Sequence, residues 1–132
     1  MIAVDASALV AIGDLEPDGD VFTAALASAT SAIISPINAA EAGLILIGRG
    51  RLESVVALSV WMSELSLEVS NDSASHEDVL IAYLTFGKRY HPAKLNLGDC
   101  FAYALAKRLD VPLLYKGEDF AKTDIRSALQ PT

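Results

Sequence analysis

The sequence predicts an α/β protein in which a mostly parallel sheet lies between two layers of helices, a three-layer α/β/α sandwich. Short apolar runs alternate with longer helical patterns along the chain. The runs are apolar on both sides, as strands covered on both faces must be. The chain has 132 residues, 52% of them hydrophobic, and contains no linker or low-complexity tract. We therefore expect one domain over residues 1–132.

The N-terminal part of the chain opens with a strand and a helix. Residues 2–4, Ile-Ala-Val, predict the strand, and the apolar run 5–12 predicts a helix that follows directly. Residues 16–20 have the composition of a turn. The alanine-rich run 21–29 then predicts a second helix, and Ala-Ile-Ile at 32–34 predicts a second strand.

The middle of the chain predicts two helices and one strand. Ser-Pro at 35–36 provides an N-cap and a proline at the first helical position. The helix should cover 36–47, with Gly48 as its C-terminal stop. Residues 52–65 predict a largely buried helix because apolar residues fill most of the run, and 67–69 predict a brief strand.

The last third of the chain repeats this alternation. Ser75 and Asp78 resemble a capping box and predict a helix that ends near Gly87. Residues 98–109 predict a further helix, residues 111–115 predict the last strand, and a short element should end the chain.

Acidic side chains occur where a strand ends or a helix begins, at Asp5, Glu41, Asp99 and the pair Glu118 and Asp119. Ligands of parallel sheets bind beyond the carboxyl ends of the strands, so these acids are expected to meet at one edge. Carboxylates brought together repel one another unless a cation joins them. Their joint placement predicts a Mg²⁺ or Mn²⁺ site suited to cutting a phosphodiester. Either residue of the last pair could be the fourth acid.

Each acid also has a simpler explanation when it is taken alone. Asp5 suits the N-cap of the helix behind it, in which Ser7 is then an ordinary helix residue. Asp99 suits the first turn of its helix, and the pair 118–119 suits a solvated turn or a cap. Glu41 lies on the apolar face of its helix, so its carboxylate needs either an arginine or a metal as partner.

Composition restricts the class of protein. The formal net charge of −7 opposes binding of a polyanion, although salt screening, a bound cation or a basic partner protein would offset part of it. The single cysteine forms no intrachain disulfide and excludes a zinc site built on several thiolates. No apolar run reaches membrane length and no cationic stretch precedes an apolar one at the N-terminus, so a cytoplasmic location is expected.

Other chemistries have weaker support in the sequence. Cys100 could act as a nucleophile with His76 or His91 as base, but nothing places either histidine near it. There is no Gly-x-Ser-x-Gly, Walker or dinucleotide-binding glycine pattern. A phosphate-accepting aspartyl domain would require further acids beside Asp5, where alanine and serine stand.

Two surface features leave alternatives open. The basic stretch 87–94 could contact an RNA backbone through Lys88, Arg89, His91 and Lys94, or could simply place cations at a helix C-terminus. The apolar runs 44–47 and 55–65 could form a partner surface, and ordinary core is the favoured interpretation.

Over its whole length the sequence resembles the PIN-domain ribonucleases, and within them the toxins of VapBC toxin–antitoxin pairs. The resemblance is carried by four blocks of residues. They are Val4 to Leu9, Glu41 in its alanine-flanked helix, Leu95 to Ala106, and Leu113 to Phe120 together with Thr123, Asp124 and Ile125.

The resemblance implies an α/β/α fold, a metal-dependent endoribonuclease, homodimerisation and inhibition by a VapB-type antitoxin whose C-terminal segment covers the active site. Higher toxin–antitoxin assemblies are also implied. The family's catalytic, metal-binding acids correspond to Asp5, Glu41, Asp99 and Asp119. Secondary site residues would be Ser7, Asn96 and Glu118, and Lys116 would join the RNA contacts. Asp5 and Asp99 would bind the ion directly, with Glu41 and Asp119 holding its waters or completing a second site.

Two alternatives of other kinds stay open. The acids could serve only to bind a basic partner peptide, in a module without catalysis. The same scaffold could also cut DNA in place of RNA.

Overall fold

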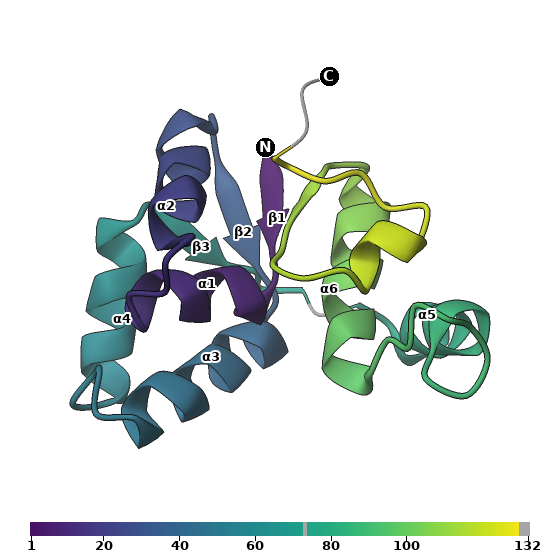
Figure 1. Ribbon diagram of the computed structural model, residues 1–132, viewed down its shortest axis with the longest axis horizontal. Coiled ribbons are helices and arrows are strands. Elements are labelled where there is room, and N and C mark those ends of the chain that lie inside the picture. The colour runs from purple at the N-terminus through teal and green to yellow at the C-terminus, as the bar shows by residue number, and fades with distance from the viewer. Residues whose placement is uncertain (73, 130–132) are drawn as a thin grey trace.

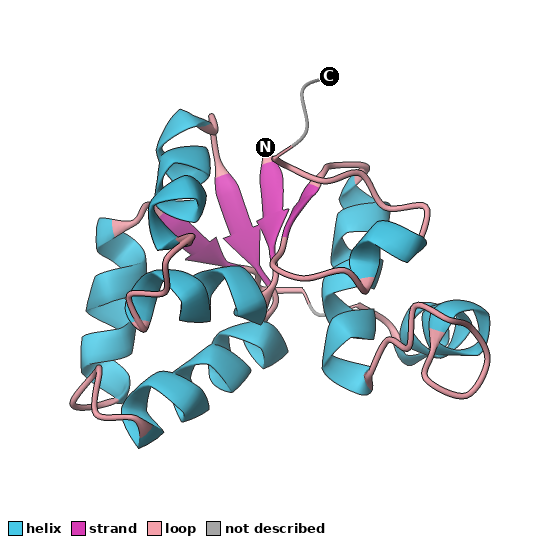
Figure 2. Ribbon diagram, viewed as in Figure 1, coloured by secondary structure: helices cyan, strands magenta, loops and turns pink. Residues whose placement is uncertain are grey.

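The structure, a computed structural model, describes residues 1–72 and 74–129 and contains a four-stranded parallel sheet between layers of helices (Figures 1 and 2). The strands are β1 (Ile2–Val4), β2 (Ala32–Ile34), β3 (Leu67–Val69) and β4 (Leu113–Leu114). They lie in the order β3-β2-β1-β4. The predicted α/β/α sandwich is confirmed.

The helices divide between the two faces of the sheet (Figure 1). One face carries α1 (Ala6–Gly13), α2 (Gly19–Ser28), α3 (Pro36–Gly48) and α4 (Val55–Glu64). The other carries α5 (His76–Phe86), α6 (Leu97–Leu109) and a short 3₁₀ turn at Phe120–Lys122. Because all strands run the same way, α1 and α3 begin at one edge of the sheet, the edge where β1 and β2 end.

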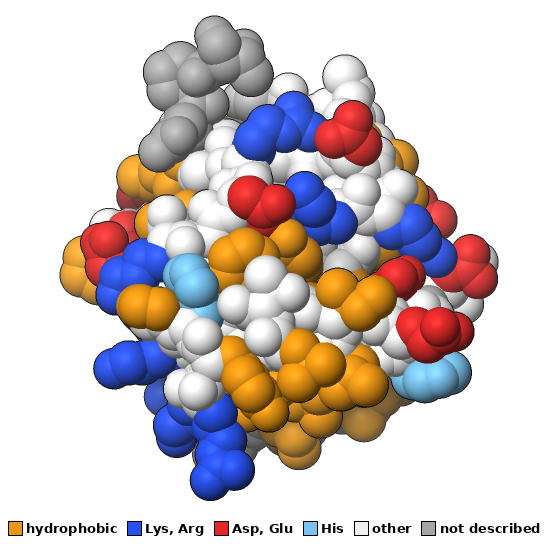
Figure 3. Space-filling view, turned by 90° about the vertical axis from the view of Figure 1, so that its right-hand side faces the viewer, with side chains coloured by type: hydrophobic (Ala, Val, Ile, Leu, Met, Phe, Trp, Pro, Cys, Tyr) orange, Lys and Arg blue, Asp and Glu red, His pale blue; other side chains and the backbone are white. Residues whose placement is uncertain are grey.

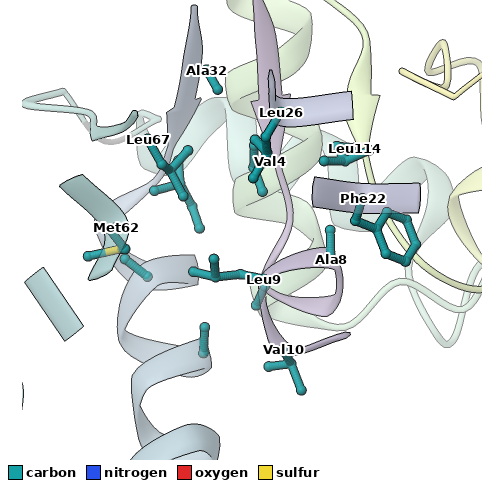
Figure 4. Packing of buried hydrophobic residues seen from close by; sticks show 14 of the residues in the cluster. Val4, Ala8, Leu9, Val10, Phe22, Leu26, Ala32, Met62, Leu67 and Leu114 are labelled. Carbon is teal, nitrogen blue, oxygen red and sulfur yellow. The ribbon is translucent and has the colours of Figure 1, made fainter. Parts of the chain in front are cut away.

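Alternating strand residues supply the two cores. Val4 and Leu114 point into the core under α1 to α4, which Figure 4 shows around Leu9. Their neighbours Ala3 and Leu113 point into the core under α5 and α6. The strand pairing sets Ala3 beside Leu113 and Val4 beside Leu114, so the period-two alternation is in register across the sheet. Because side chains on both faces of β1 are buried, the end of this strand has a fixed position, and Asp5 follows it directly.

The predicted elements are confirmed in type and order, and their ends differ by a few residues. Helix α2 begins at Gly19, earlier than predicted. Helix α3 continues through Gly48, so the predicted stop there is wrong. The chain leaves this helix at Gly50, whose φ of 73° lies in the left-handed region that glycine adopts without strain.

Helix α4 is shorter and more exposed than predicted. Ser54 caps it, because its Oγ atom accepts a hydrogen bond from the Ala57 amide. Only Leu58 and Met62 of the helix are buried. In the two apolar runs 44–47 and 55–65, the exposed large apolar residues are Leu44 and Ile45 of α3 and Val55, Val56 and Val60 of α4. The interpretation of both apolar runs as ordinary core is therefore wrong for these positions.

The C-terminal segment protects the outer edge of β4. The Leu113 amide donates to the Arg126 carbonyl, and the Ala128 amide donates to the Leu113 carbonyl. Asp124 holds the segment against α6, where it accepts hydrogen bonds from the Tyr103 hydroxyl and from Lys107 Nζ. An edge strand covered in this way offers few free backbone groups for pairing with another chain.

Among the residues described, no helix combines the length and the apolar character needed to cross a bilayer.

Candidate active site

Asp5 is the N-cap of α1, as predicted, and its side chain is only 4% exposed. The Ser7 amide and the Ser7 hydroxyl both donate to Asp5 Oδ2, at 3.1 and 2.6 Å. Ser7 does not engage Oδ1. Burial raises the pKa of the Asp5 carboxyl in spite of these bonds, and the charge of Glu41 adds to the rise. Asp5 is thus a desolvated carboxylate with a fixed orientation.

Ser7 is more than an ordinary helix residue, which corrects the simpler interpretation. Its Oγ atom donates to Asp5 and also accepts a hydrogen bond from the Lys116 amide at 3.0 Å. Since Lys116 follows β4 and Ser7 follows β1, this hydroxyl joins the ends of two neighbouring strands beside the acid.

Asp99 lies in the first turn of α6 and forms a capping box with Asn96. The Asp99 amide donates to Asn96 Oδ1 at 2.8 Å, and the Asn96 amide donates to Asp99 Oδ2 at 3.0 Å. The helix therefore begins at Leu97, one residue before the predicted start. Burial raises the pKa of Asp99 to about 6, with further contributions from the charges of Asp5, Asp119 and Glu41.

Glu41 lies in the second turn of α3 and finds an amide, not an arginine, as its partner. Its Oε1 atom accepts a hydrogen bond from Asn38 Nδ2 at 2.7 Å. The carboxylate lies against Gly98 of α6, where an added Cβ atom would come within 2.7 Å of Glu41 Cδ. Helices α3 and α6, from opposite sides of the sheet, thus meet at this side chain.

These acids share one cavity of about 290 Å³. Its polar lining residues are Asp5, Ser7, Glu16, Glu41, Asp99 and Lys116. Lys116 Nζ forms an ion pair with Glu16 and another with Asp18 at 3.1 Å. Lys116 is the one cation that lines the cavity among the described residues, and it is already paired with two carboxylates.

Asp119 and Glu118 are both exposed and do not line the cavity. Asp119 stands at the N-cap position of the 3₁₀ turn but makes no side-chain capping bond, so the simple cap explanation fails for it. Its charge is one of those that raise the pKa of Asp99, whereas that of Glu118 is not. Asp119 therefore lies near enough to Asp99 for its charge to act on that acid.

The sequence matches the family model of the PIN domain over residues 2–126. The chain belongs to the PIN-domain family. It is 37% identical over 131 residues to VapC ribonuclease Mb0640 of Mycobacterium bovis, which covers 98% of the chain and 100% of that protein. It is 39% identical over 124 residues to ribonuclease VapC36 of Mycobacterium tuberculosis, covering 92% and 89% of the two chains. These relatives assign the PIN domain to the VapC type.

Solved structures give the same fold. VapC20 of Mycobacterium tuberculosis, described as a sarcin-ricin loop cleaving toxin, superposes with a TM-score of 0.73 at 16% identity, over 95% of this chain and 96% of that one. PAE2754 of Pyrobaculum aerophilum gives 0.61 at 20% identity, over 95% and 86%. At these identities the likeness concerns the fold of the PIN domain alone.

The acids of this PIN domain have the donor chemistry of a hard divalent cation, because all are carboxylates. Within residues 1–72 and 74–129, however, no three His, Cys, Asp or Glu side chains are close enough to form a ready-made metal cluster. The local hydrogen bonds described above occupy Oδ2 of Asp5, Oδ2 of Asp99 and Oε1 of Glu41. The donors fit such a cation if small side-chain movements bring the remaining oxygens together.

The predicted RNA contacts of the stretch 87–94 do not line the acidic cavity. Lys88, Arg89 and Lys94 are exposed and follow the end of α5 at Phe86. His91 has a local structural role, because its Nδ1 atom accepts a hydrogen bond from the Ala93 amide and its ring packs edge-on against Phe86. In this PIN domain only Lys116 of the predicted contacts adjoins the acids.

Lys88 instead adjoins an apolar cavity of about 630 Å³ between α5 and the start of α6. Figure 3 shows apolar side chains gathered on one face of the molecule. Leu80 and Leu97, which line this cavity, are both exposed. The apolar cavity carries no carboxylate among its lining residues and is chemically unlike the acidic one.

Cys100 has no features of a catalytic nucleophile. It is fully buried, and burial together with the nearby charge of Asp99 raises the pKa of its thiol to about 11. The side chain therefore stays a neutral thiol at physiological pH and serves the core of the PIN domain.

Sequence reasoning missed Asn38, Gly98 and Glu16. Asn38 carried a signal, since it is a polar residue in an apolar helical run, three positions before Glu41 and thus on the same face. The sequence gives no specific signal for a role of Gly98 or Glu16 at the site, because their roles depend on which segments the fold brings together.

Proposed function

We propose that this VapC-type PIN domain is a divalent-metal-dependent endoribonuclease and the toxin of a toxin–antitoxin pair. The observation that carries the proposal is the single cavity onto which Asp5, Glu41 and Asp99 open from three different helices. It is supported by the full-length similarity to proteins named ribonucleases.

In this proposal Asp5 and Asp99 hold the cation directly. Ser7 and the Asn96 amide fix Oδ2 of these two acids and so direct their other oxygens. A Mg²⁺ or Mn²⁺ ion held there supplies a water of lowered pKa and positive charge beside the phosphoryl oxygens. Glu41 and Asp119 orient water at the cavity or complete a second cation site, and Glu118 has at most a secondary part.

Lys116 is the proposed contact to the RNA phosphate next to the scissile bond. Its ammonium group now pairs with Glu16 and Asp18, so a phosphate has to replace these partners. Lys88, Arg89, His91 and Lys94 are proposed to contact the RNA further from the cavity. Local cations of this kind matter because the net charge of −7 otherwise repels a polyanion.

We further propose a VapB-type antitoxin as the protein partner. The exposed apolar residues Leu44 and Val56 suit an apolar segment of such a partner. Ile45, the neighbour of Leu44, lines the acidic cavity, so a basic side chain of the same partner would reach the carboxylates. Homodimerisation, with higher toxin–antitoxin assemblies built on it, is part of the proposal and is tested by the mass of the purified protein in solution.

The decisive assay incubates the purified, partner-free chain with RNA and Mn²⁺, with and without a chelator. We expect cleavage that stops with chelator and returns when Mn²⁺ is restored in excess. Asp99→Asn keeps the shape and the capping bond of the side chain, so it should stay folded and lose cleavage. Full activity of this variant, or cleavage insensitive to chelator, would refute the metal-dependent mechanism.

The same assay separates the alternatives. A DNA strand of matching sequence, run beside the RNA, distinguishes a deoxyribonuclease. A binding module without catalysis would cut neither strand, although its acidic cavity would still retain an arginine-rich peptide.

A further inference from the structure

The buried amide of Asn38 links two helices that carry site acids. The side chain is 0% exposed, and its Nδ2 atom donates to Glu41 Oε1 at 2.7 Å and to the Gly98 carbonyl at 3.0 Å. Gly98 immediately precedes Asp99 in α6. One amide group thus contacts the carboxylate of α3 and the backbone that carries the acid of α6.

The orientation of this amide is fixed by its surroundings. If the group were reversed, Asn38 Oδ1 would face the Glu41 carboxylate and the Gly98 carbonyl, both of which only accept hydrogen bonds. As the amide stands, Oδ1 is buried and lacks a hydrogen-bond partner among the described residues. A buried polar atom without a partner carries a free-energy penalty. The penalty is tolerated because the Nδ2 atom of the same amide donates hydrogen bonds to both Glu41 and Gly98.

Gly98 lies against the same carboxylate. A Cβ atom added there would meet three atoms of Glu41 closer than 3.0 Å, Oε1, Oε2 and Cδ. The φ angle of Gly98 is not among the positive ones, so its backbone does not require glycine. Its lack of a side chain is required for space, and the space is filled by Glu41.

We propose that Asn38 and Gly98 are positioning residues that together set the Glu41 carboxylate on the wall of the acidic cavity. Asn38 holds one oxygen by a hydrogen bond, and Gly98 leaves the room in which the group lies. The inference rests on the proposed function, because it assigns Glu41 to the cation that the cavity is proposed to bind.

The test measures Mn²⁺ binding to the RNA-free protein, from the electron paramagnetic resonance signal of free Mn²⁺, alongside RNA cleavage. The variants are Asn38→Ala and Gly98→Ala, each alone and combined with Glu41→Ala. Gly98→Ala removes no hydrogen-bonding group, so it still tests the inference if Asn38→Ala does not fold. Ser35→Ala is the matched control, since Ser35 is buried at the start of the same helix and its Oγ atom also lacks a partner.

We expect each single variant to weaken Mn²⁺ binding and slow cleavage by about 10- to 100-fold, as substitutions of residues that orient metal-binding side chains do. In the Glu41→Ala background the same substitutions should change Mn²⁺ binding by less than about 2-fold, because the group they position is gone. Ser35→Ala should behave as wild type. A purely structural role would instead give equal losses in both backgrounds.

Three outcomes would overturn the inference. Folded Asn38→Ala and Gly98→Ala that bind Mn²⁺ as wild type does would show that Glu41 needs neither residue. Full losses in the Glu41→Ala background would assign the effects to general structure. A wild-type protein that binds no Mn²⁺ would remove this inference and the proposed function together, whereas Mn²⁺ binding that depends on Asn38 without RNA cleavage would refute only the proposed function.

Discussion

Asp99 is the residue whose ionisation should be most visible in solution. Its pKa rises from 3.8 to about 6 in the folded protein, chiefly through burial. Between these pH values the folded, metal-free protein binds more protons at this site than the unfolded chain does. The contribution of Asp99 to the free energy of unfolding is therefore largest below pH 3.8, and it is lost as the pH rises to about 6.

This gives the first prediction. In a chelator-containing buffer, the contribution of Asp99 should lower the melting temperature as pH rises from about 4 to about 6, and Asp99→Asn should remove that contribution. The comparison is the difference between variant and wild type at each pH. A difference that stays constant across the window would contradict the raised pKa.

The second prediction separates the two adjacent acids near the 3₁₀ turn. Asp119→Asn should reduce RNA cleavage by about 10-fold or more, because the Asp119 carboxylate is proposed to orient water at the cation or to complete a second cation site. Glu118→Gln, which removes the same charge from the adjacent exposed residue, is the matched control and should have little effect. Rates of cleavage at saturating Mn²⁺ measure both. A larger loss for Glu118→Gln would reverse the assignment of the fourth acid.

At the scale of single residues, the sequence predicted the acids better than their partners. Asp5 and Asp99 follow from rules about strand ends and helix starts, which are local. For Glu41 the sequence left an arginine or a metal open as the partner, and the hydrogen-bond partner in the structure is neither of these but Asn38. That pairing is reinforced by Gly98, sixty residues away, and such an approach of α3 to α6 is a property of the packed fold.

At the scale of elements, α4 shows the limit of apolar patterns. The run 52–65 is rich in apolar residues, and we expected burial from their number. Only one narrow side of the helix, with Leu58 and Met62, faces the core. Val55 and Val56 point outward at 72% and 71% exposure. Apolar residues that a partner covers and those that the core covers look alike in a single sequence.

The third prediction tests this arrangement of α4. Leu58→Ala should lower the free energy of unfolding by about 2–5 kcal/mol, because it removes buried methyl groups and leaves a cavity. Val56→Ala, on the exposed side of the same helix, should change it by less than about 0.5 kcal/mol. Urea denaturation of the two variants measures both values. Similar losses for both would contradict the exposed placement of Val56.

At the scale of the whole molecule, the parallel sheet and the two-sided helix layers were predicted from the alternation of strands and helices, whereas the strand order β3-β2-β1-β4 comes from the structure alone. The strand ends then bring acids from distant parts of the chain to one edge. The order of strands and helices does not determine how closely the carboxylates approach one another. Among the described residues, no three of them are close enough to hold a metal ion as they stand. That last approach depends on side-chain positions that repulsion among unneutralised carboxylates disfavours.

The fourth prediction follows from this repulsion. Mn²⁺ or Mg²⁺ should raise the melting temperature of the wild-type protein, since a ligand that binds only the folded state stabilises it in proportion to RT ln(1 + [L]/Kd). Asp5→Asn and Asp99→Asn should abolish most of the rise. Ca²⁺-free buffer with chelator provides the baseline, and a rise of equal size in both variants would indicate binding elsewhere on the acidic surface.

The central claim is that acids from separate helices hold one divalent ion in the shared cavity. The most direct measurement is the anomalous scattering of manganese from crystals grown with Mn²⁺. The account predicts a peak in the cavity, in contact with Asp5 and Asp99 and close to Glu41. Manganese bound only outside this cavity, or acidic side chains that stay apart at saturating Mn²⁺, would contradict it.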